Sequence, residues 1–392
     1  MKTIAVLTAT RAEYGLLRPF IKALSDQGLK AQLLVTGMHL SGSFGLTVRE
    51  IEADGAEVAA KIPILVDSDT PSGVSKTMAL AMLGFSDYFA ANRPDALLVL
   101  GDRYETLAVC CTALNERIPI IHLYGGETTE GAIDEAIRHA ITKMSYLHLT
   151  STDEYRKRVI QLGEHPDRVF NVGAIGIENA LNLNLLSIDE LGDSLGISLQ
   201  KPYAVMTYHP VTLDDKELLA DLNELLDVVA SHPDITFLST KANADAGGRA
   251  INMRLAEFAV DHPNLLLFDS LGSLRYLSAI ASASFVIGNS SSGLLEAPAF
   301  LTPTINIGDR QRGRIKPESV IDCGEDATSI ENALRTAMSS EFREQLIGMD
   351  NPYGDGHTSR KAARLIGDFL GGEIDLKKSF FDLECAAEDM NV

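Results

Sequence analysis

Several short segments combine charged or hydroxylic side chains with glycine, and each follows an apolar run. In residues 8–15 (TATRAEYG), Arg11 lies just before a predicted helix. Backbone N–H groups at a helix start, together with a guanidinium, form an anion site. The competing interpretation is that Arg11 caps carbonyls or pairs with Glu13. The segment is neither a G-x-G-x-x-G nor a Walker loop, which disfavours dinucleotide and P-loop binding.

Carboxylates gather in two further segments of the amino-terminal half. Asp102 and Arg103 lie in residues 101–105 (GDRYE), where partial burial of a carboxylate can tune it for proton transfer. Aspartate is also a favoured helix N-cap, so that role stays open. Residues 125–135 (GGETTEGAIDE) carry Glu127 and Asp134 after two glycines that permit close backbone approach to a ligand. Ordinary charge matching at a helix start is the alternative.

The carboxyl-terminal half has its own candidates. His209 follows an apolar run in TYHP, where an imidazole can contact a phosphate or transfer a proton, although a lone histidine is often structural. Ser290 and Ser291 lie in residues 288–293 (GNSSSG), whose hydroxyls and amides suit a phosphate. A serine-capped turn is the alternative.

Two charged residues follow these serines. The carboxylate of Glu296 lies one turn further on, where it can accept hydrogen bonds from a vicinal diol such as ribose. Arg310 belongs to the basic segment GDRQRGR of a strongly acidic chain, which favours an anion nearby.

Other classes of site lack support in the sequence. The nine histidines form no H-x-x-x-H pair and no C-x-x-C is present, so we expect neither a metal ion nor a cofactor. No G-x-S-x-G elbow follows a strand, which disfavours a serine hydrolase. The four cysteines make no disulfide framework, as in a reducing cytosol.

The elements that must position these residues alternate between apolar runs and amphipathic stretches. Predicted strands cover 4–7, 33–35, 96–100, 118–123, 147–149, 203–207, 236–238, 265–268, 285–287 and 304–307. Predicted helices cover 14–25, 76–91, 104–115, 133–144, 153–162, 178–186, 218–230, 250–260, 274–281 and 294–300. Continuous apolar runs are typical of strands buried on both faces, so the pattern predicts doubly wound parallel α/β sheets.

The alternation occurs twice, which predicts two domains with a cleft between them. We expect an amino-terminal domain at 1–173, a connector at 174–202, a second domain at 203–370 and a carboxyl-terminal arm at 371–392. Ligands of open α/β sheets bind at the carboxyl ends of strands, where all the candidate residues lie.

Composition limits the partners. The 392 residues include 54 acidic and 34 basic side chains, a formal charge of −20. This charge repels nucleic acid and anionic membrane surfaces, so we expect neither as a partner. The first residues do not form a signal-peptide core and no stretch is apolar enough to cross a membrane, so we expect a cytoplasmic protein.

The motifs TATRAEYG, VTGMH, LGDRYE, GGETTEGAIDEAIRHAITKMS, TYHP, GNSSSGLLEAP and INIGDRQRGR together resemble one family. It is the hydrolysing UDP-N-acetylglucosamine 2-epimerases of sialic-acid biosynthesis, the NeuC type of bacterial capsule pathways. The resemblance extends from Ile4 to about residue 370. It implies a GT-B fold, with two Rossmann-like domains and a nucleotide-sugar in the cleft, and a homodimer or homotetramer.

The resemblance also implies the reaction and the roles of the residues. UDP-GlcNAc would lose UDP by anti elimination to 2-acetamidoglucal, and water would then add to give ManNAc. The residues that would act on the sugar as acid or base are Asp102, Glu127 and Asp134. The residues that would hold UDP and the sugar diphosphate are Arg11, Arg103, His209, Asn243, Ser290, Ser291, Glu296 and Arg310.

One position departs from the family pattern, and other functions compete. Some family members carry an acidic residue where this chain has Tyr124, so weight shifts to Glu127, Asp134 and Glu135. The departure also fits another sugar, UDP-2,4-diacetamido-2,4,6-trideoxyglucose of the legionaminic-acid pathway. A non-catalytic nucleotide-sugar-binding protein is a further alternative, against which the clustered carboxylates argue. A GT-B glycosyltransferase is the weakest.

Overall fold

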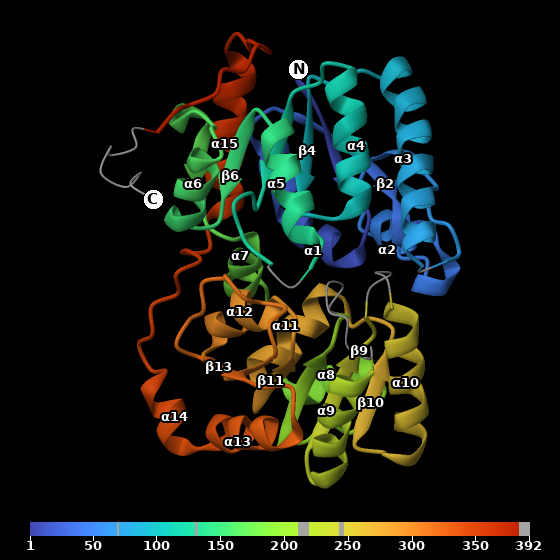
Figure 1. Cartoon of the computed structure of the whole chain (residues 1–392), viewed down its shortest axis with the longest axis vertical. Coiled ribbons are helices and arrows are strands. Elements are labelled where there is room, and N and C mark those ends of the chain that lie inside the picture. Colours follow the sequence, from blue (N-terminus) through green and yellow to red (C-terminus); the bar gives the residue numbers. More distant parts are fainter. Residues whose placement is uncertain (69, 130–131, 211–218, 243–246, 384–392) are drawn as a thin grey trace, which may run out of the picture.

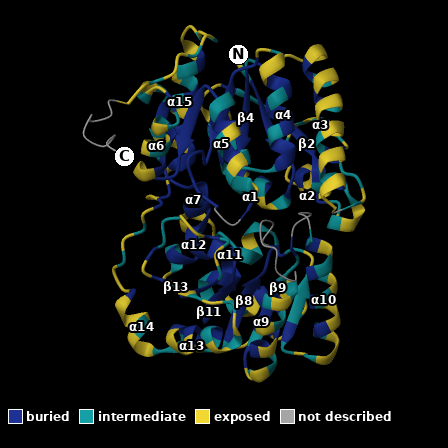
Figure 2. Ribbon diagram, in the orientation of Figure 1, coloured by how far each residue is buried: buried dark blue, intermediate teal, exposed yellow. Residues whose placement is uncertain are grey.

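The computed structural model describes residues 1–68, 70–129, 132–210, 219–242 and 247–383. Two parallel β-sheets, one above the other in Figure 1, are each covered by helices on both faces. Figure 2 shows that the strands of both sheets are mostly buried, while exposed residues lie on the outer helices. The predicted fold class, two doubly wound α/β units, is therefore confirmed.

The first sheet has seven strands in the order β3-β2-β1-β4-β5-β6-β7. Its strands are β1 (Thr3–Thr8), β2 (Lys30–Thr36), β3 (Val58–Ile62), β4 (Ala96–Leu100), β5 (Ile120–Leu123), β6 (Leu147–Thr150) and β7 (Val169–Asn171). The helices between them are α1 (Arg11–Asp26), α2 (Val48–Ala53), α3 (Pro71–Ala91), α4 (Tyr104–Asn115), α5 (Asp134–Met144) and α6 (Asp153–Gln161). Short 3-10 turns lie at η1 (Gly37–Leu40), η2 (Gly42–Phe44) and η3 (Pro166–Arg168).

The second sheet has six strands in the order β10-β9-β8-β11-β12-β13. Its strands are β8 (Tyr203–Thr207), β9 (Thr236–Thr240), β10 (Leu265–Phe268), β11 (Phe285–Gly288), β12 (Thr304–Ile307) and β13 (Val320–Cys323). Its helical segments are α9 (Ala220–Ser231), α10 (Gly248–Asp261), α11 (Gly272–Ser282), α12 (Ser292–Leu295), η4 (Ala297–Phe300), α13 (Ala327–Met338) and α14 (Ser340–Gln345).

Burial on both faces explains why the central strands are continuous apolar runs. In β1, Ile4 and Val6 pack into one buried cluster, while Ala5 and Leu7 pack into another on the opposite face. Both faces of a central strand therefore contribute apolar area to the core, at roughly 25 cal/mol per Å² buried.

The connector holds two helices, α7 (Ile175–Asn182) and α8 (Ile188–Leu195), where the sequence predicted one at 178–186. Ser187 and Glu190 form a capping box at the start of α8, and Gly196 ends it in the left-handed conformation.

The last helix, α15 (Thr358–Gly371), returns to the first sheet, as its place at the top of Figure 1 shows. Its buried side chains, such as Ala362 and Ile366, belong to the same core cluster as Ile4. The sequence placed these residues with the second domain. We therefore propose that the first domain consists of the amino-terminal segment plus α15.

The sequence prediction differs from the structure mainly at the sheet edges. The strands β3, β7 and β13 were not predicted, because they lie at edges or next to them and are short or half exposed. The helix predicted at 294–300 is instead the single turn α12 followed by η4, which contains Pro298. Proline has no N–H to continue an α-helix.

Strand order brings the candidate residues together. In the first sheet the direction of winding reverses between β1 and β4, and in the second between β8 and β11. Loops that leave the carboxyl ends of such neighbouring strands form a crevice. Thr10 and Asp102 follow the first pair, and His209 and Ser290 follow the second.

None of the helices in the described ranges is long and apolar enough to span a membrane.

Candidate active site

A cleft of about 800 Å³ lies between the two sheets. This volume falls within the ordinary size of a small-molecule site, roughly 300–1,000 Å³. Ten of the predicted site residues line it: Arg11, Asp102, Arg103, Glu127, Asp134, His209, Ser290, Ser291, Glu296 and Arg310. The eleventh, Asn243, lies outside the described residues.

Asp102 pairs with a buried arginine rather than capping a helix. It follows β4 and Gly101, while the N-cap of α4 is Arg103. The carboxylate of Asp102 forms an ion pair with the guanidinium of Arg138, on α5. The Asp102 side chain is 22% exposed and that of Arg138 only 2%, so the carboxylate reaches the cleft while its partner is fully enclosed.

Arg138 has spare hydrogen-bonding capacity. Its Nη2 also donates to Thr129 Oγ1 at 2.9 Å. Its Nε and Nη1 are buried and have no hydrogen-bond partner among the described residues. Burial, followed by the neighbouring charge of Arg314, lowers the pKa of Arg138. Unpaired N–H groups beside further arginines favour an anion, because a buried charge must be compensated.

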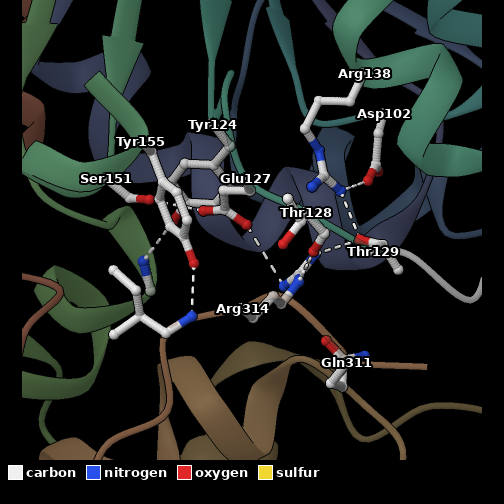
Figure 3. Close-up of polar contacts among 12 residues, drawn as sticks. Asp102, Tyr124, Glu127, Thr128, Thr129, Arg138, Ser151, Tyr155, Gln311 and Arg314 are labelled. Carbon is white, nitrogen blue, oxygen red and sulfur yellow. Dashed lines mark hydrogen bonds and ion pairs between the residues drawn. The ribbon is translucent and has the colours of Figure 1, made fainter. Parts of the chain in front are cut away.

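Glu127 is enclosed by polar groups from both halves (Figure 3). Ser151 Oγ donates to Glu127 Oε1 at 2.7 Å, and Arg314 Nη1 lies 3.5 Å from Glu127 Oε2. The Glu127 side chain is 3% exposed. Glu127 is therefore a buried, paired carboxylate in the wall of the cleft.

Asp134 is the first residue of α5, and its neighbour Glu135 holds the loop in front of it. Glu135 accepts from Thr129 N at 2.5 Å and pairs with His139 at 3.0 Å. Glu135 and His139, four residues apart on one face of α5, thus form an ion pair. Burial raises the pKa of Glu135, but hydrogen bonds from His139 and Thr129 outweigh it and leave the pKa lowered.

Tyr124, which precedes the two glycines 125 and 126, joins the loop after β5 to the connector. Its backbone is left-handed, with φ of 67°, and its hydroxyl accepts from Gly176 N at 3.2 Å. Gly176 lies in the first turn of α7, where N–H groups lack helical partners. Burial, reinforced by Glu127, raises the Tyr124 pKa, so the hydroxyl stays protonated.

The start of α1 brings Arg11 to the cleft. Thr10 and Glu13 form a capping box, with Glu13 accepting from Ala9 N at 2.7 Å. Burial raises the pKa of Glu13 to about 7. The carboxylate of Glu13 therefore accepts hydrogen bonds from backbone N–H groups. The guanidinium of Arg11 pairs with Glu50 at 2.9 Å.

Across the cleft, Asn289 organises the loops of the second sheet. Its side chain accepts from His209 N at 2.7 Å and donates to His209 O at 2.9 Å. Its carbonyl accepts from Arg310 Nη1 at 3.1 Å and Gln311 Nε2 at 2.8 Å. One asparagine therefore fixes the His209 turn, the Ser290 loop and the Arg310 loop relative to one another.

Glu296 follows α12 and faces the connector. A Cβ added at Gly176 would lie 2.5 Å from Glu296 Oε1, so the glycine makes room for this carboxylate. Burial raises the pKa of Glu296 to about 7, although a hydrogen bond with Ser292 opposes it. The protonated form can donate and the ionised form can only accept.

The sequence prediction overlooked three residues that the structure places among these groups. Arg138 was visible only as a neighbour of Asp134 on one helix face, and Asn289 stood within GNSSSG. Arg314 stood in the basic segment, but its contacts lie 185 and 186 residues away along the chain. No local pattern reports such a contact.

Within the described ranges, no cluster of three or more His, Cys, Asp or Glu side chains could hold a metal ion. The chemistry available to the described residues is thus proton transfer by carboxylates on one wall and binding of an anion by arginine, serine and histidine on the other.

Comparison with known proteins identifies the family. Residues 22–367 match the family model described as UDP-N-acetylglucosamine 2-epimerase. A Campylobacter jejuni protein named GDP/UDP-N,N'-diacetylbacillosamine 2-epimerase (hydrolyzing) is 41% identical over 97% of this chain and 99% of its own length. The Polysialic acid biosynthesis protein P7 of Escherichia coli is 39% identical over 98% of this chain and 99% of its own.

A third relative, from Legionella pneumophila, is named UDP-N,N'-diacetylbacillosamine 2-epimerase (hydrolyzing) and is 32% identical over 93% of this chain and 96% of its own. Among solved structures, the UDP-GlcNAc 2-epimerase of Neisseria meningitidis bound to UDP-GlcNAc has a TM-score of 0.78 at 17% identity, covering 93% of this chain and 99% of that one. This likeness confirms the GT-B fold. The chain belongs to the UDP-N-acetylglucosamine 2-epimerase family.

Proposed function

We propose that this protein is a hydrolysing 2-epimerase of a UDP-linked 2-acetamido sugar, which releases UDP and the free 2-epimer. The observation that carries the proposal is the division of the cleft. Asp102, Glu127 and Asp134 lie on the wall of the first sheet, and an arginine, two serines and a histidine lie opposite.

The proposed reaction uses both walls. A carboxylate removes the weakly acidic hydrogen from C2 while the C1–O bond to UDP breaks, which leaves a glycal. Water then adds its oxygen to C1. C2 gains a proton on the face opposite to the one from which the hydrogen was removed, so the configuration at C2 inverts. Carboxylates held close to C2 serve the proton transfers, and cationic groups stabilise the departing diphosphate.

We assign the residues as the sequence resemblance implied. Asp102 and Asp134, with Glu127, act at the sugar. UDP is held by Arg11, His209, Asn243, Ser290, Ser291, Glu296 and Arg310, with Arg103 at the sugar diphosphate. Arg138 joins this set, because its buried Nε and Nη1 have no hydrogen-bond partner among the described residues.

Two substrates fit this chemistry. The names of the Campylobacter and Legionella relatives support the diacetamido sugar N,N'-diacetylbacillosamine. The apolar side chains of Leu16, Met38 and Phe44 in the cleft also suit the methyl groups of that sugar. UDP-GlcNAc, which the sequence motifs implied, is the second candidate, and the name of the polysialic acid relative supports it.

The test is to incubate the purified protein with each UDP-sugar and to follow UDP and free sugar by NMR. We expect release of UDP with the 2-epimer from the diacetamido substrate. Release from UDP-GlcNAc instead, as ManNAc, would select the second candidate. Saturable UDP binding without turnover of either sugar would contradict enzymatic function and select a nucleotide-sugar-binding protein.

A further inference from the structure

One guanidinium of the second domain bonds three consecutive residues of the first. Arg314 lies in the loop between β12 and β13. Its Nε donates to Thr128 O at 2.8 Å, its Nη2 donates to Thr129 Oγ1 at 3.1 Å, and its Nη1 lies 3.5 Å from Glu127 Oε2. The Arg314 side chain is 8% exposed, so these contacts are shielded from water.

Thr129 extends the contact to the second carboxylate. Its Oγ1 accepts from Arg314 Nη2 and from Arg138 Nη2, and Arg138 pairs with Asp102. A hydroxyl oxygen has two lone pairs, and here each receives a guanidinium from a different domain. Figure 3 shows the resulting chain from Asp102 through Arg138, Thr129 and Arg314 to Glu127.

The charges explain why this series of contacts depends on Thr129, which lies at its centre. The two guanidiniums are close enough for Arg314 to lower the pKa of Arg138. Each is balanced by its own carboxylate, and Thr129 supplies the shared neutral acceptor between them. Removing a guanidinium leaves a buried carboxylate without its partner, and removing the Thr129 hydroxyl leaves two buried N–H donors without an acceptor; both losses are costly at low dielectric constant.

We propose that Arg314, in the second domain, is a positioning residue. It acts through Thr129 to hold the carboxylates of Glu127 and Asp102 in the positions that catalysis requires. The inference rests on the proposed function of these carboxylates. It adds an interdomain dependence, because the geometry of the carboxylates on the first domain requires a side chain from the second.

The test compares R314M, T129V and the double variant. Arg314 positions the carboxylates, so we expect R314M and T129V each to lower kcat about 10- to 100-fold, the loss that follows small misplacement of reacting groups. The Kd for UDP should stay within about twofold. The double variant should be little worse than R314M alone, because both changes break one network. T129S keeps the hydroxyl and should retain wild-type kcat.

The matched control is K316M in the same loop. Lys316 pairs with Asp322 at 2.7 Å, and this pair is more exposed, at 28% and 54%. Its kcat should equal that of the wild type. Loss of UDP affinity in R314M equal to its loss of kcat/KM would overturn the proposal, since Arg314 would then be a ligand-binding residue. Additive effects in the double variant, or wild-type kcat in T129V, would also overturn it.

Amide hydrogen exchange, which needs no turnover, tests this inference separately from the proposed function. Thr129 N–H donates to Glu135 and its loop is held by Arg314, so we expect slow amide exchange at residues 127–129. R314M should accelerate it there and leave β6 unchanged. A wild-type protein that turns over neither UDP-sugar contradicts the proposed function, whereas unchanged exchange in R314M contradicts the positioning role.

Discussion

Three carboxylates of the amino-terminal wall have well-defined partners in the structure. Asp102 pairs with Arg138 and Glu127 with Arg314, while Glu13 is occupied by backbone N–H groups. The sequence predicted which segments reach the cleft, because strand ends are visible as the ends of apolar runs. It left the role of Asp102 open between helix cap and catalysis, because its partner on α5 is brought close only by the fold.

The first prediction concerns Asp102. Replacing it by asparagine keeps the shape but removes the base and the charge that balances Arg138. We expect kcat to fall at least about 100-fold, the usual contribution of acid–base catalysis, while UDP binds as in the wild type. Turnover and calorimetric UDP binding measure the two effects. Wild-type turnover in D102N and D134N would reject the assigned roles.

The second prediction concerns a glycine at the cleft. Gly272 has φ of 72°, and a Cβ there would collide with the guanidinium of Arg11. G272A should cost about 1 kcal/mol of unfolding free energy, because alanine strains in this conformation. It should also weaken UDP-sugar binding about 10-fold by displacing Arg11, the scale of a lost charged hydrogen bond.

Gly28 supplies the matched control for this substitution. It has the same φ of 72°, and a Cβ there would meet nothing within 4 Å. G28A should therefore show a similar stability loss with unchanged binding. Equal binding losses in both variants, or none in G272A, would contradict the role of Arg11 at the cleft.

At the scale of elements, the central strands were predictable, whereas three of the four edge strands, β3, β7 and β13, were not. The bounds of β4, β8 and β12 agree with the predicted ones, because burial on both faces requires an unbroken apolar run. Edge strand β3 alternates between half-buried and exposed positions and carries no such run. Helix α8 was missed although its capping box, Ser187 and Glu190, is legible in the sequence.

The segment after α15 was predicted only as an arm, and its contacts are specific. Lys378 Nζ donates to Lys143 O at 2.6 Å and Ser145 O at 2.8 Å, at the end of α5, and to Glu164 at 2.9 Å. Phe381 N donates to Gly163 O at 2.9 Å. The arm therefore fastens the carboxyl-terminal end of the helix that begins with Asp134.

The third prediction concerns Glu164, at the centre of this contact. Burial opposes its charge, but hydrogen bonds from His148, Lys143 and Lys378 lower its pKa from 4.5 to about 2. A lowered carboxyl pKa stabilises the fold above the unfolded value. The stabilisation, about 3 kcal/mol at pH 7, is lost as pH falls from 4.5 toward 2.

E164Q should therefore unfold at a lower temperature than the wild type at pH 7, and the difference should shrink below pH 4.5. Thermal unfolding across pH measures it. A difference that does not change with pH would mean that charge at Glu164 contributes nothing.

At the scale of the whole molecule, the repeated sequence pattern predicted two sheets and a cleft. It did not predict the contacts across the cleft. The return of α15 to the first sheet depends on long-range packing that no local period records. The charged contacts that join the halves include the buried one of Arg314 and an exposed one between Arg249 and Asp67.

The fourth prediction contrasts these two contacts. Arg249 and Asp67 are 47% and 84% exposed, and such pairs contribute only about 0–1 kcal/mol because water screens them. D67N should therefore keep kcat and the unfolding temperature close to the wild type, whereas R314M should not keep kcat. A D67N variant as impaired as R314M would show that charge contact between the halves, rather than the buried network, sets activity.

The most direct test of the proposed reaction is turnover in D₂O followed by NMR of the released sugar. If carboxylates of the first domain remove the C2 hydrogen and solvent returns one, the free sugar must carry deuterium at C2 with inverted configuration, alongside UDP. Release of UDP with a sugar that keeps its original C2 hydrogen and configuration would show simple hydrolysis at C1 and contradict the account.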